Sequence, residues 1–314
     1  MKIKVAVVMG GPSPECDVSL VTGAGVAEAL RGLGYDVIEF LLNKNLPIVL
    51  QHANVDVVFP ALHGPLGEDG CLQGLLEILE IPYVGSSVLG SALGMNKYVT
   101  KRMLSAVKVP TPKGLMFHVG DDLTTFLAQI AEYVGGPSLM VKPNRQGSAL
   151  GASRVFKEED LRPAIERSVT LGGDALVEEF IVGKEITVGV LEKDGECIAL
   201  PVIEIHAKKE WYDYEARYTP GMSVHDCPAK LSAEMRQRLQ TFAIQVHRVL
   251  ECRHLSRVDF VVTDQDQLYV LEVNTIPGMT PTSLFPEAAQ AHGISFSDLV
   301  DGLVQGALFQ VPRR

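Results

Sequence analysis

The feature that most constrains this chain is a pair of apolar segments in its last quarter. Residues 258–262 and 268–273 are almost continuously apolar and are separated by a short polar turn, which predicts a hairpin of two buried strands. Antiparallel pairing brings Asp259, Glu272 and Asn274 to the same end of that hairpin. Two carboxylates placed together repel each other unless a cation lies between them. An all-oxygen ligand set favours Mg²⁺, particularly Mg²⁺ shared with nucleotide phosphates.

The residues around this predicted cation site favour ligand binding. Arg257 is a permanent cation that can hold a carboxylate or a developing oxyanion. A polar loop with Gly278 and Ser283 follows the hairpin, and glycine lets a ligand approach the backbone. For Asp259 and Glu272 taken alone, an acidic hairpin end solvated by water is an equally good interpretation. The loop favours the binding site.

The bulk composition excludes several classes of protein. With 314 residues, 46% hydrophobic and 21% charged, the chain fits a globular protein of two or three domains. A formal net charge of −10 argues against nucleic acid or an anionic membrane as partner. Its cysteines are scattered without a Cys-x-x-Cys spacing, which favours reduced thiols over disulfides or a zinc site. Without a membrane-spanning run or signal-peptide core, we expect a soluble cytoplasmic protein with no membrane partner.

The N-terminal part has the pattern of a parallel α/β unit. The apolar run 5–9 ends at two glycines, which predicts a buried strand and a loop. A helix is expected next, with Asp17 as its cap. Its apolar face is expected to contain Val18, Val21, Val26 and Leu30. Strands at 36–41 and 55–62 continue the βαβ pattern.

Two loops beyond strand ends carry polar residues, where open α/β sheets place ligands. Taken alone, Glu15 is a surface carboxylate or a helix-dipole partner, and His63 is a structural hydrogen-bonding residue. Lys101 and Arg102, on a predicted helix, are expected to be solvated. The local pattern by itself therefore assigns neither Glu15 nor His63 a role in catalysis.

The middle of the chain contains a predicted phosphate-binding loop. A strand at 138–142 ends at Lys142, and the loop 143–153 of mostly small residues follows it before a strand at 154–156. Small residues let backbone N–H groups point at an anion, and the lysine adds a point charge. A Walker loop is excluded because its Gly-Lys-Ser/Thr is missing.

The C-terminal half is expected to begin with a hairpin of strands 186–191 and 197–205. Residues 206–230 have little periodicity but are aromatic at their centre, which indicates a functional loop. A core helix capped by Ser232 should follow. Two helices, 283–291 and 295–309, are expected to end the chain, the second with a capping box at its start.

These motifs together resemble the D-alanine:D-alanine ligases of the ATP-grasp superfamily. The resemblance runs nearly end to end. Its motifs are Gly-Gly-x-Ser-x-Glu-x-x-Val-Ser-Leu at 10–20, His-Gly-Pro-x-Gly-Glu-Asp-Gly at 63–70, Lys-Pro-x-x-x-Gly-Ser-x-x-Gly at 142–151, Tyr-Asp-Tyr-x-x-Arg-Tyr at 212–218, Arg-x-Asp at 257–259 and Glu-x-Asn-Thr-x-Pro-Gly-Met-Thr at 272–280.

The resemblance implies an ATP-dependent ligase that joins two D-alanines through an acyl phosphate for peptidoglycan synthesis. It implies that Glu15 binds the ammonium of the first D-alanine and that His63 helps to hold the substrate and the acyl phosphate. The remaining implied substrate contacts are Arg257 and the Gly278 N–H at the tetrahedral oxyanion, Ser283 and Leu284 at the second carboxylate, and Ser148 and Tyr218 in a network with Glu15.

The resemblance also implies the nucleotide contacts. ATP phosphates are assigned to Lys97, Lys142, Ser148 and Arg217; adenine to Glu178, Glu179, Phe180 and Ile181; ribose to Glu185; and two Mg²⁺ ions, which Mn²⁺ can replace, to Asp259, Glu272 and Asn274. Ala149 and Arg217 depart from the family pattern, which has Ser and Lys there.

The implied fold class is α/β, and α+β overall. A Rossmann-like N-terminal domain is expected at 1–87, a central ATP-grasp lid domain at 88–178, and a C-terminal ATP-grasp domain at 179–314 with an ω-loop at 206–230. The resemblance implies a homodimer. Two alternatives remain: a related ligase that takes D-lactate, D-serine or another amino acid as second substrate, and a non-catalytic nucleotide-binding protein.

Overall fold

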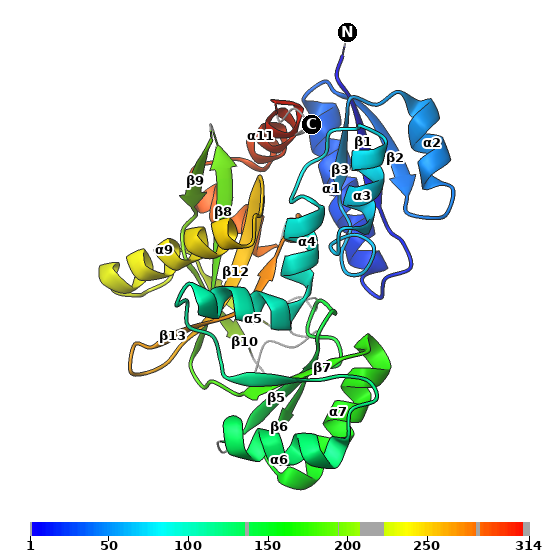
Figure 1. Ribbon diagram of the computed structural model, residues 1–314. Helices are drawn as coiled ribbons and strands as arrows, with labels where there is room; N and C mark the ends of the chain where they lie inside the picture. Colours follow the sequence, from blue (N-terminus) through cyan, green and yellow to red (C-terminus); the bar gives the residue numbers. More distant parts are fainter. Residues whose placement is uncertain (1, 136–137, 194, 208–222, 281–282, 310–314) are drawn as a thin grey trace.

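The computed structural model describes residues 2–135, 138–193, 195–207, 223–280 and 283–309. Three sheets with flanking helices organise this part of the chain (Figure 1). The expected Arg217 and Tyr218 lie outside the described residues. Among the described residues, no helix is both long and apolar enough to cross a membrane.

The first sheet is parallel, with strand order β2-β1-β3, as the βαβ pattern predicts. Its strands are β1 (Lys4–Met9), β2 (Asp36–Leu41) and β3 (Val57–Pro60), and the helices beside it are α1 (Cys16–Gly32), α2 (Leu46–Ala53) and α3 (Cys71–Ile78). Val5 and Val7 of β1 are completely buried in the core that this sheet forms with its neighbours. Loops at the carboxyl ends of β1 and β3 carry Glu15 and His63 toward one edge of the sheet.

The start of α1 differs from the prediction. Glu15, not Asp17, occupies the N-cap position, and no side chain caps the helix there. The predicted apolar face is also partly wrong: Val21 is 55% exposed, and both Val18 and Val21 line a pocket. The buried face consists of Ser19, Thr22, Gly23, Val26, Ala27 and Leu30. Because small and hydroxylic side chains fit against a strand closely, this face packs on the sheet although it is less apolar.

The second sheet is antiparallel, with strand order β4-β7-β5-β6. It consists of β4 (Gly114–Phe117), β5 (Leu139–Pro143), β6 (Ser153–Val155) and β7 (Ala175–Glu179), with helices α6 (Leu123–Tyr133) and α7 (Glu158–Gly172) packed on it. The loop predicted to bind phosphate joins β5 to β6. Figure 1 shows this unit at the opposite end of the molecule from the first sheet.

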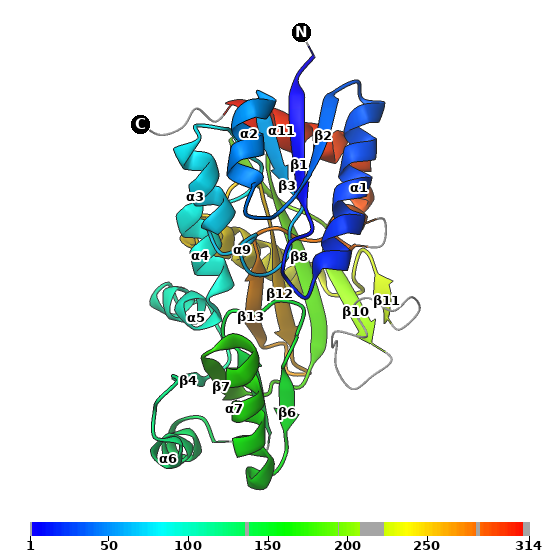
Figure 2. The same cartoon turned by 90° about the vertical axis from the view of Figure 1, so that its right-hand side faces the viewer.

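The third sheet has strand order β11-β10-β8-β12-β13, with β9 also paired to β8. Its strands are β8 (Lys184–Lys193), β9 (Glu196–Ala199), β10 (Ile203–Ala207), β11 (Ser223–Asp226), β12 (Leu255–Val262) and β13 (Leu268–Asn274). Figure 2 shows β10, β8, β12 and β13 side by side above the second sheet. Helices α4 (Val88–Met95), α5 (Lys97–Ala106) and α9 (Ala233–Val249) pack near it, and Ser232 caps α9 as predicted.

The strand predicted at 197–205 is interrupted. Val190 pairs with Ala199 and Thr187 with Ile203, so the five residues 199–203 lie opposite the four residues 187–190 of β8. The extra residue, together with Pro201, which has no N–H to donate, separates β9 from β10. Residues 223–226, inside the predicted aperiodic segment, form β11 on the edge of the sheet.

The end of the chain packs against its beginning. Helices α10 (Leu284–Ala291) and α11 (Phe296–Phe309) begin close to the predicted residues, and Ser295 caps α11 by accepting from the Asp298 N–H at 3.1 Å. Helix α11 lies beside the first sheet (Figure 1). Its side chains share one core with β1, and Tyr35 donates a 2.5 Å hydrogen bond to Asp301. The first and third sheets are therefore joined through a common core.

Candidate active site

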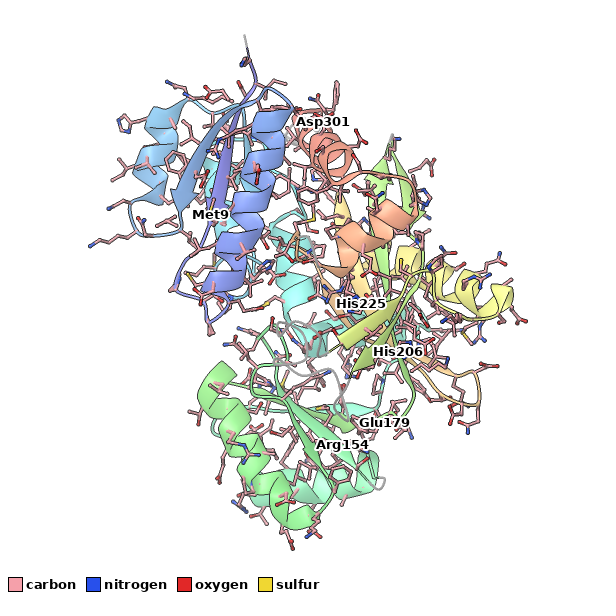
Figure 3. The ribbon with its side chains drawn as sticks, turned by 180° about the vertical axis from the view of Figure 1, so that it is seen from behind. Met9, Arg154, Glu179, His206, His225 and Asp301 are labelled. Carbon is pink, nitrogen blue, oxygen red and sulfur yellow. The ribbon has the colours of Figure 1, made fainter. Side chains whose placement is uncertain are left out.

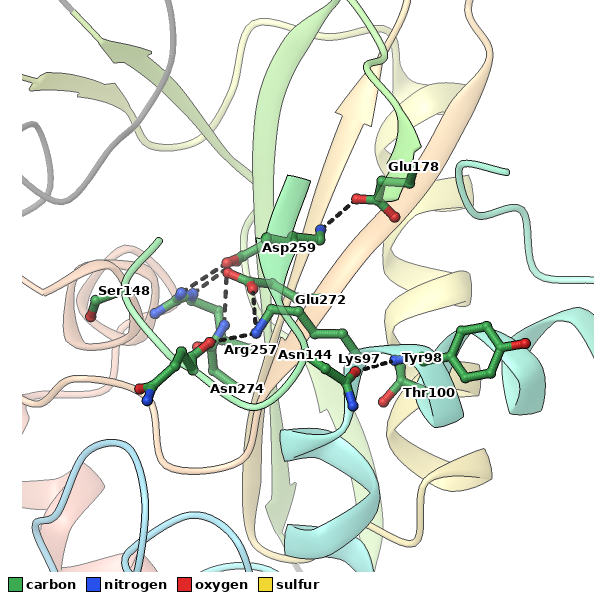
Figure 4. Close-up of polar contacts among 12 residues, drawn as sticks. Lys97, Tyr98, Thr100, Asn144, Ser148, Glu178, Arg257, Asp259, Glu272 and Asn274 are labelled. Carbon is green, nitrogen blue, oxygen red and sulfur yellow. Dashed lines mark hydrogen bonds and ion pairs between the residues drawn. The ribbon is translucent and has the colours of Figure 1, made fainter. Parts of the chain in front are cut away.

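The predicted hairpin is formed by β12 and β13, and its register confirms the predicted convergence. Asp259 lies directly opposite Glu272, and Arg257 lies opposite Asn274. Asn274 donates from Nδ2 to Asp259 Oδ2 at 3.2 Å (Figure 4). On the other side of β12, Thr187 of β8 donates to Asp259 Oδ1 at 2.6 Å. The sheet therefore holds these three oxygen-bearing side chains, Asp259, Glu272 and Asn274, at one point.

Positive charge faces both carboxylates of this group. Arg257 donates from Nε and Nη2 to the two oxygens of Asp259, each at 2.9 Å. Lys97 Nζ lies 3.5 Å from Glu272 Oε2 (Figure 4). Two carboxylates and an amide are hard oxygen donors of the kind that Mg²⁺ prefers, and the residues present therefore fit a divalent cation.

A second cluster of charges lies where β5 ends and the phosphate-binding loop begins. Glu178 is buried and accepts from Lys142 Nζ at 2.5 Å and from Lys101 Nζ at 2.6 Å. Burial opposes the charged form, but the two ammonium groups outweigh it and lower the pKa of Glu178. The prediction that Lys101 is solvated is wrong, because α5 turns it toward β7; Arg102 is exposed as expected. Burial lowers the pKa of Lys101.

Glu178, the first residue of the segment 178–181 predicted to contact adenine, thus has its carboxylate engaged with lysines. That segment lines a pocket between the second and third sheets. The predicted nucleotide residues that line this pocket are Lys97, Lys142, Glu178, Glu179, Phe180, Ile181 and Glu185, together with Asp259 and Glu272. The structure therefore brings them to one cavity. Burial also lowers the pKa of Lys97, whose Nζ donates to the Gln146 carbonyl at 2.6 Å.

Arg154 is a pocket residue that the sequence reasoning missed. Its guanidinium carbon lies 4.2 Å from the ring centroid of Phe156 and 3.9 Å from that of Phe180. Figure 3 shows Arg154 and Glu179 in the same region of the second sheet. Arg154 and Phe156 are two positions apart on the predicted strand 154–156 and therefore share one face. The sequence pattern could thus have indicated their contact. The stacking holds Phe180 in place at the wall of the pocket.

A second pocket lies on the other side of the hairpin end. The predicted substrate residues that line it are Glu15, His63, Ser148, Arg257, Gly278, Ser283 and Leu284, and Asn274 joins them. Ser148 donates to Glu15 Oε1, as expected for the predicted network. Ser283 Oγ accepts from the Thr280 N–H at 3.0 Å.

His63 is buried and Glu68 is half-buried at this second pocket. Burial and the positive charge of Arg257 lower the pKa of His63 to about 4, so its imidazole is neutral at pH 7. Burial and the negative charge of Glu15 raise the pKa of Glu68 to about 8. Glu68 had no predicted role, although it stands in the Gly-Glu-Asp-Gly loop, and its carboxylate accepts from the Gly64 N–H at 2.7 Å. It is a second pocket residue that sequence reasoning missed.

Two glycines let the chain approach these groups closely. A Cβ at position 147 would lie 2.7 Å from Glu15 Oε2, and a Cβ at position 278 would lie 2.8 Å from Ser283 Oγ. Both distances are too short for a carbon contact, so Gly147 and Gly278 fit where a larger residue would displace a polar side chain.

The two pockets meet at the hairpin end. Asp259 and Glu272 line the pocket between the second and third sheets, whereas Arg257 and Asn274 line the pocket that contains Glu15 and His63. The phosphate-binding loop also reaches both, since Ser148 lines one pocket and the next residue lines the other. This arrangement can bring the terminal phosphate of a nucleotide beside the carboxylate of a small substrate.

Known proteins share the sequence and the fold along nearly the whole chain. Family profiles described as "D-ala D-ala ligase C-terminus" and "D-ala D-ala ligase N-terminus" match residues 103–305 and 49–86. A D-alanine–D-alanine ligase of Carboxydothermus hydrogenoformans is 44% identical over 96% of this chain and 97% of its own length.

Solved structures agree with this relationship. D-alanine–D-alanine ligase from Bacillus anthracis complexed with ATP has a TM-score of 0.83 and 32% identity, covering 98% of this chain and 97% of that one. The VanG D-Ala:D-Ser ligase from Enterococcus faecalis has a TM-score of 0.84 and 31% identity, covering 97% and 99%. This chain therefore belongs to the D-alanine–D-alanine ligase family of ATP-dependent ATP-grasp enzymes, as its motifs predicted.

Proposed function

We propose that this chain joins two D-alanine molecules to D-alanyl-D-alanine, with conversion of ATP to ADP and phosphate, in the synthesis of a peptidoglycan precursor. The observation that carries the proposal is the meeting of two pockets at the end of the β12–β13 hairpin. One pocket has the lysines and carboxylates suited to a metal–nucleotide complex. The other has a buried carboxylate, a neutral imidazole and an arginine suited to an amino acid.

The reaction has two steps. A carboxylate oxygen of the first D-alanine attacks the γ-phosphorus of ATP, and ADP leaves. The neutral amine of the second D-alanine then attacks the acyl carbon, loses a proton, and expels inorganic phosphate. Lys97 and Lys142 neutralise phosphate oxygens, because each ammonium group lies at the wall of the nucleotide pocket. Asp259, Glu272 and Asn274 would hold the two Mg²⁺ ions, which supply further neutralisation of phosphate charge.

The substrate pocket orients both amino acids. Glu15, which accepts a hydrogen bond from Ser148, binds the ammonium group of the first D-alanine through its carboxylate. Arg257 and the Gly278 N–H stabilise the tetrahedral oxyanion. Ser283 and Leu284 begin α10, whose N-terminal N–H groups favour the carboxylate of the second substrate.

The neutral imidazole of His63 lies 3.2 Å from Thr22 Oγ1 through Nε2 and lines the substrate pocket, so it helps to hold the substrate and the acyl phosphate without adding charge. In the nucleotide pocket, the backbone of residues 178–181 reads adenine and Glu185 binds the ribose hydroxyls. Arg217 and Tyr218 lie outside the described residues and keep the roles that the resemblance implies, at the ATP phosphates and in the network with Glu15.

The test is phosphate release from ATP and Mg²⁺ with D-alanine, L-alanine, D-lactate or D-serine, with the product identified by mass. Release that depends on D-alanine, yields D-alanyl-D-alanine and is abolished by Glu272→Gln supports the proposal. ATP binding without D-alanine-dependent release contradicts it.

A related ligase with D-serine as second substrate is the second candidate. It is favoured by the 31% identity and equal fold similarity to the Enterococcus faecalis D-Ala:D-Ser ligase. The same substrate panel separates the two candidates: D-alanyl-D-serine as the main product at equal concentrations of the two amino acids would favour the second.

We also propose the domain division and assembly implied by the family. Three sheets support a Rossmann-like unit at 1–87, a lid unit at 88–178 and a C-terminal unit at 179–314. The proposed state is a cytoplasmic homodimer. Light scattering on the purified full chain tests the dimer, since a mass of 34.1 kDa would identify a monomer.

A further inference from the structure

Three potential metal ligands meet on the third sheet, away from both pockets. Glu192 of β8 and Cys197 of β9 pair directly across their hairpin, and His247 projects from α9, which packs on both strands (Figure 1). Their ligand atoms lie within 4.8 Å of one another. The described lining of either pocket includes none of the three.

Neighbouring groups orient two of these side chains. His247 is completely buried, and its Nδ1 lies 2.7 Å from Ser256 Oγ. In the tautomer that donates this N–H to Ser256, Nε2 presents a lone pair toward Glu192. Glu192 in turn accepts from the His254 backbone N–H through Oε2 at 2.6 Å, which leaves Oε1 facing His247. Metal-binding histidines and carboxylates are held by outer contacts of this kind.

The distance between His247 and Glu192 suits shared coordination. Nε2 and Oε1 are 3.4 Å apart, which is long for a hydrogen bond between a nitrogen and an oxygen. In a tetrahedral site with metal–ligand bonds of about 2.0 Å, two such ligand atoms are about 3.3 Å apart. Cys197 and Glu192 are half-buried, so solvent can reach the cluster while His247 remains inside.

We propose that Glu192, Cys197 and His247 form a site for a thiophilic divalent metal such as Zn²⁺, with water as fourth ligand. Binding releases the thiol proton of Cys197 to solvent. The resulting thiolate and carboxylate balance the charge of the ion, and the imidazole stays neutral. The bound ion would connect the β8–β9 hairpin to α9, beside the strand that carries Arg257.

The position of Ser256 supports this structural role. Ser256 is completely buried on β12 and contacts His247 of α9. The next residue, Arg257, points to the opposite face of the strand and lines the substrate pocket. The metal and the reacting groups therefore lie on opposite faces of one strand. No spacing motif reveals the site, because its three residues come from three different elements.

The test is titration of the metal-free full chain with Co²⁺ in excess Mg²⁺, followed by absorption. Excess Mg²⁺ occupies the oxygen-ligand site proposed at Asp259, so binding that persists belongs elsewhere. We expect one Co²⁺ per chain, with the charge-transfer absorption of a cobalt–thiolate bond. The same metal, or Zn²⁺, should raise the melting temperature of the wild type by mass action.

Three variants make the test specific. Cys197→Ser should remove the charge-transfer absorption, whereas Cys71→Ser, at an exposed thiol, should retain it. Ser256→Ala should weaken Co²⁺ binding roughly 10- to 100-fold, as loss of an outer contact does. Circular dichroism confirms that each variant is folded. Absence of binding in excess Mg²⁺, or absorption that survives Cys197→Ser, would overturn the proposal and leave Glu192 and His247 as a hydrogen-bonded pair.

Discussion

Thr187 Oγ1 donates a 2.6 Å hydrogen bond to Asp259 Oδ1 across the pairing of β8 with β12. Thr187 is almost completely buried, and its hydroxyl also approaches the Val258 carbonyl at 3.3 Å. The orientation of the proposed metal-binding carboxylate is therefore set by a residue on the neighbouring strand. Such an outer contact is expected to influence cation affinity without touching the cation.

Thr187→Val retains the shape of the side chain and removes this donor. We expect Mg²⁺ affinity to fall roughly 10- to 100-fold, because the carboxylate loses the contact that orients it. The measurement is the Mg²⁺ concentration that gives half-maximal D-alanine-dependent phosphate release. Thr124→Val, at an exposed position of α6, is the matched control. Equal Mg²⁺ dependence of the two variants would contradict the expectation.

Gly147→Ala should impair binding of the first D-alanine. The added Cβ would lie 2.7 Å from Glu15 Oε2, so the carboxylate must move. We expect the KM for D-alanine at the first site to rise roughly 10-fold, equivalent to about 1.4 kcal/mol, and to rise more than the KM for ATP. In Gly302→Ala the new Cβ meets no atom within 4 Å, and the KM should not change. A larger effect on ATP than on D-alanine would count against this role of Gly147.

Glu178→Gln should destabilise the fold. The change leaves Lys101 and Lys142 without the carboxylate that both contact at 2.5–2.6 Å, and Lys101 is buried. Removing one partner from a buried ion pair costs about 3–5 kcal/mol. Urea unfolding measures the loss.

The matched control for that experiment is Glu159→Gln. Its ion pair with Lys157 spans 3.6 Å, and both side chains are more than two-thirds exposed. We expect its free energy of unfolding to stay within about 0.5 kcal/mol of the wild type. Similar losses for the two variants would show that the buried cluster around Glu178 has no special contribution.

The raised pKa of Glu68 should give the fold a measurable pH dependence. Its pKa is raised from 4.5 to about 8, so between these values the native state holds a proton that the unfolded state has released. The contribution of Glu68 to the free energy of unfolding is complete below about pH 4.5. It is lost as pH rises through 8, by at most about 1.4 kcal/mol per pH unit.

Glu68→Gln removes that titration. We expect the variant to become progressively more stable relative to the wild type as pH rises from 4.5 to 8. His63 contributes with the opposite sign, because its pKa is lowered to about 4 and its stability is lost as pH falls. Since both proteins contain His63, its contribution cancels from the difference. A constant difference in urea unfolding across this range would show that Glu68 is ionised in the native state.

Local pattern was sufficient for the hairpin at the centre of the site. Two apolar segments and one polar turn predict the antiparallel pairing, and a register shift between Asp259 and Phe260 then places Asp259 opposite Glu272. The loop after β5, the cap of α9 and the two C-terminal helices were predicted in the same way. In each case the deciding interactions lie within a few residues or between adjacent strands, so the sequence order contains them.

Long-range packing decided the rest. The sequence pattern predicts Lys101 on the surface, but the packing of α5 near β7 buries it against Glu178. Val21 looks like a core residue until the helix presents its smaller side chains to the sheet. The pKa of Glu68 depends on Glu15, which comes from another loop.

The sequence by itself determined the N-terminal βαβ pattern, the β12–β13 hairpin, the family motifs and the polar residues that stand at strand ends. The tertiary structure alone decided which of those residues are buried, which charges neutralise one another, and that Glu192, Cys197 and His247 meet. The physical reason is that periodicity identifies the residues sharing one face of an element. It does not identify the element that packs on that face, and burial and electrostatic pairing depend on that second element.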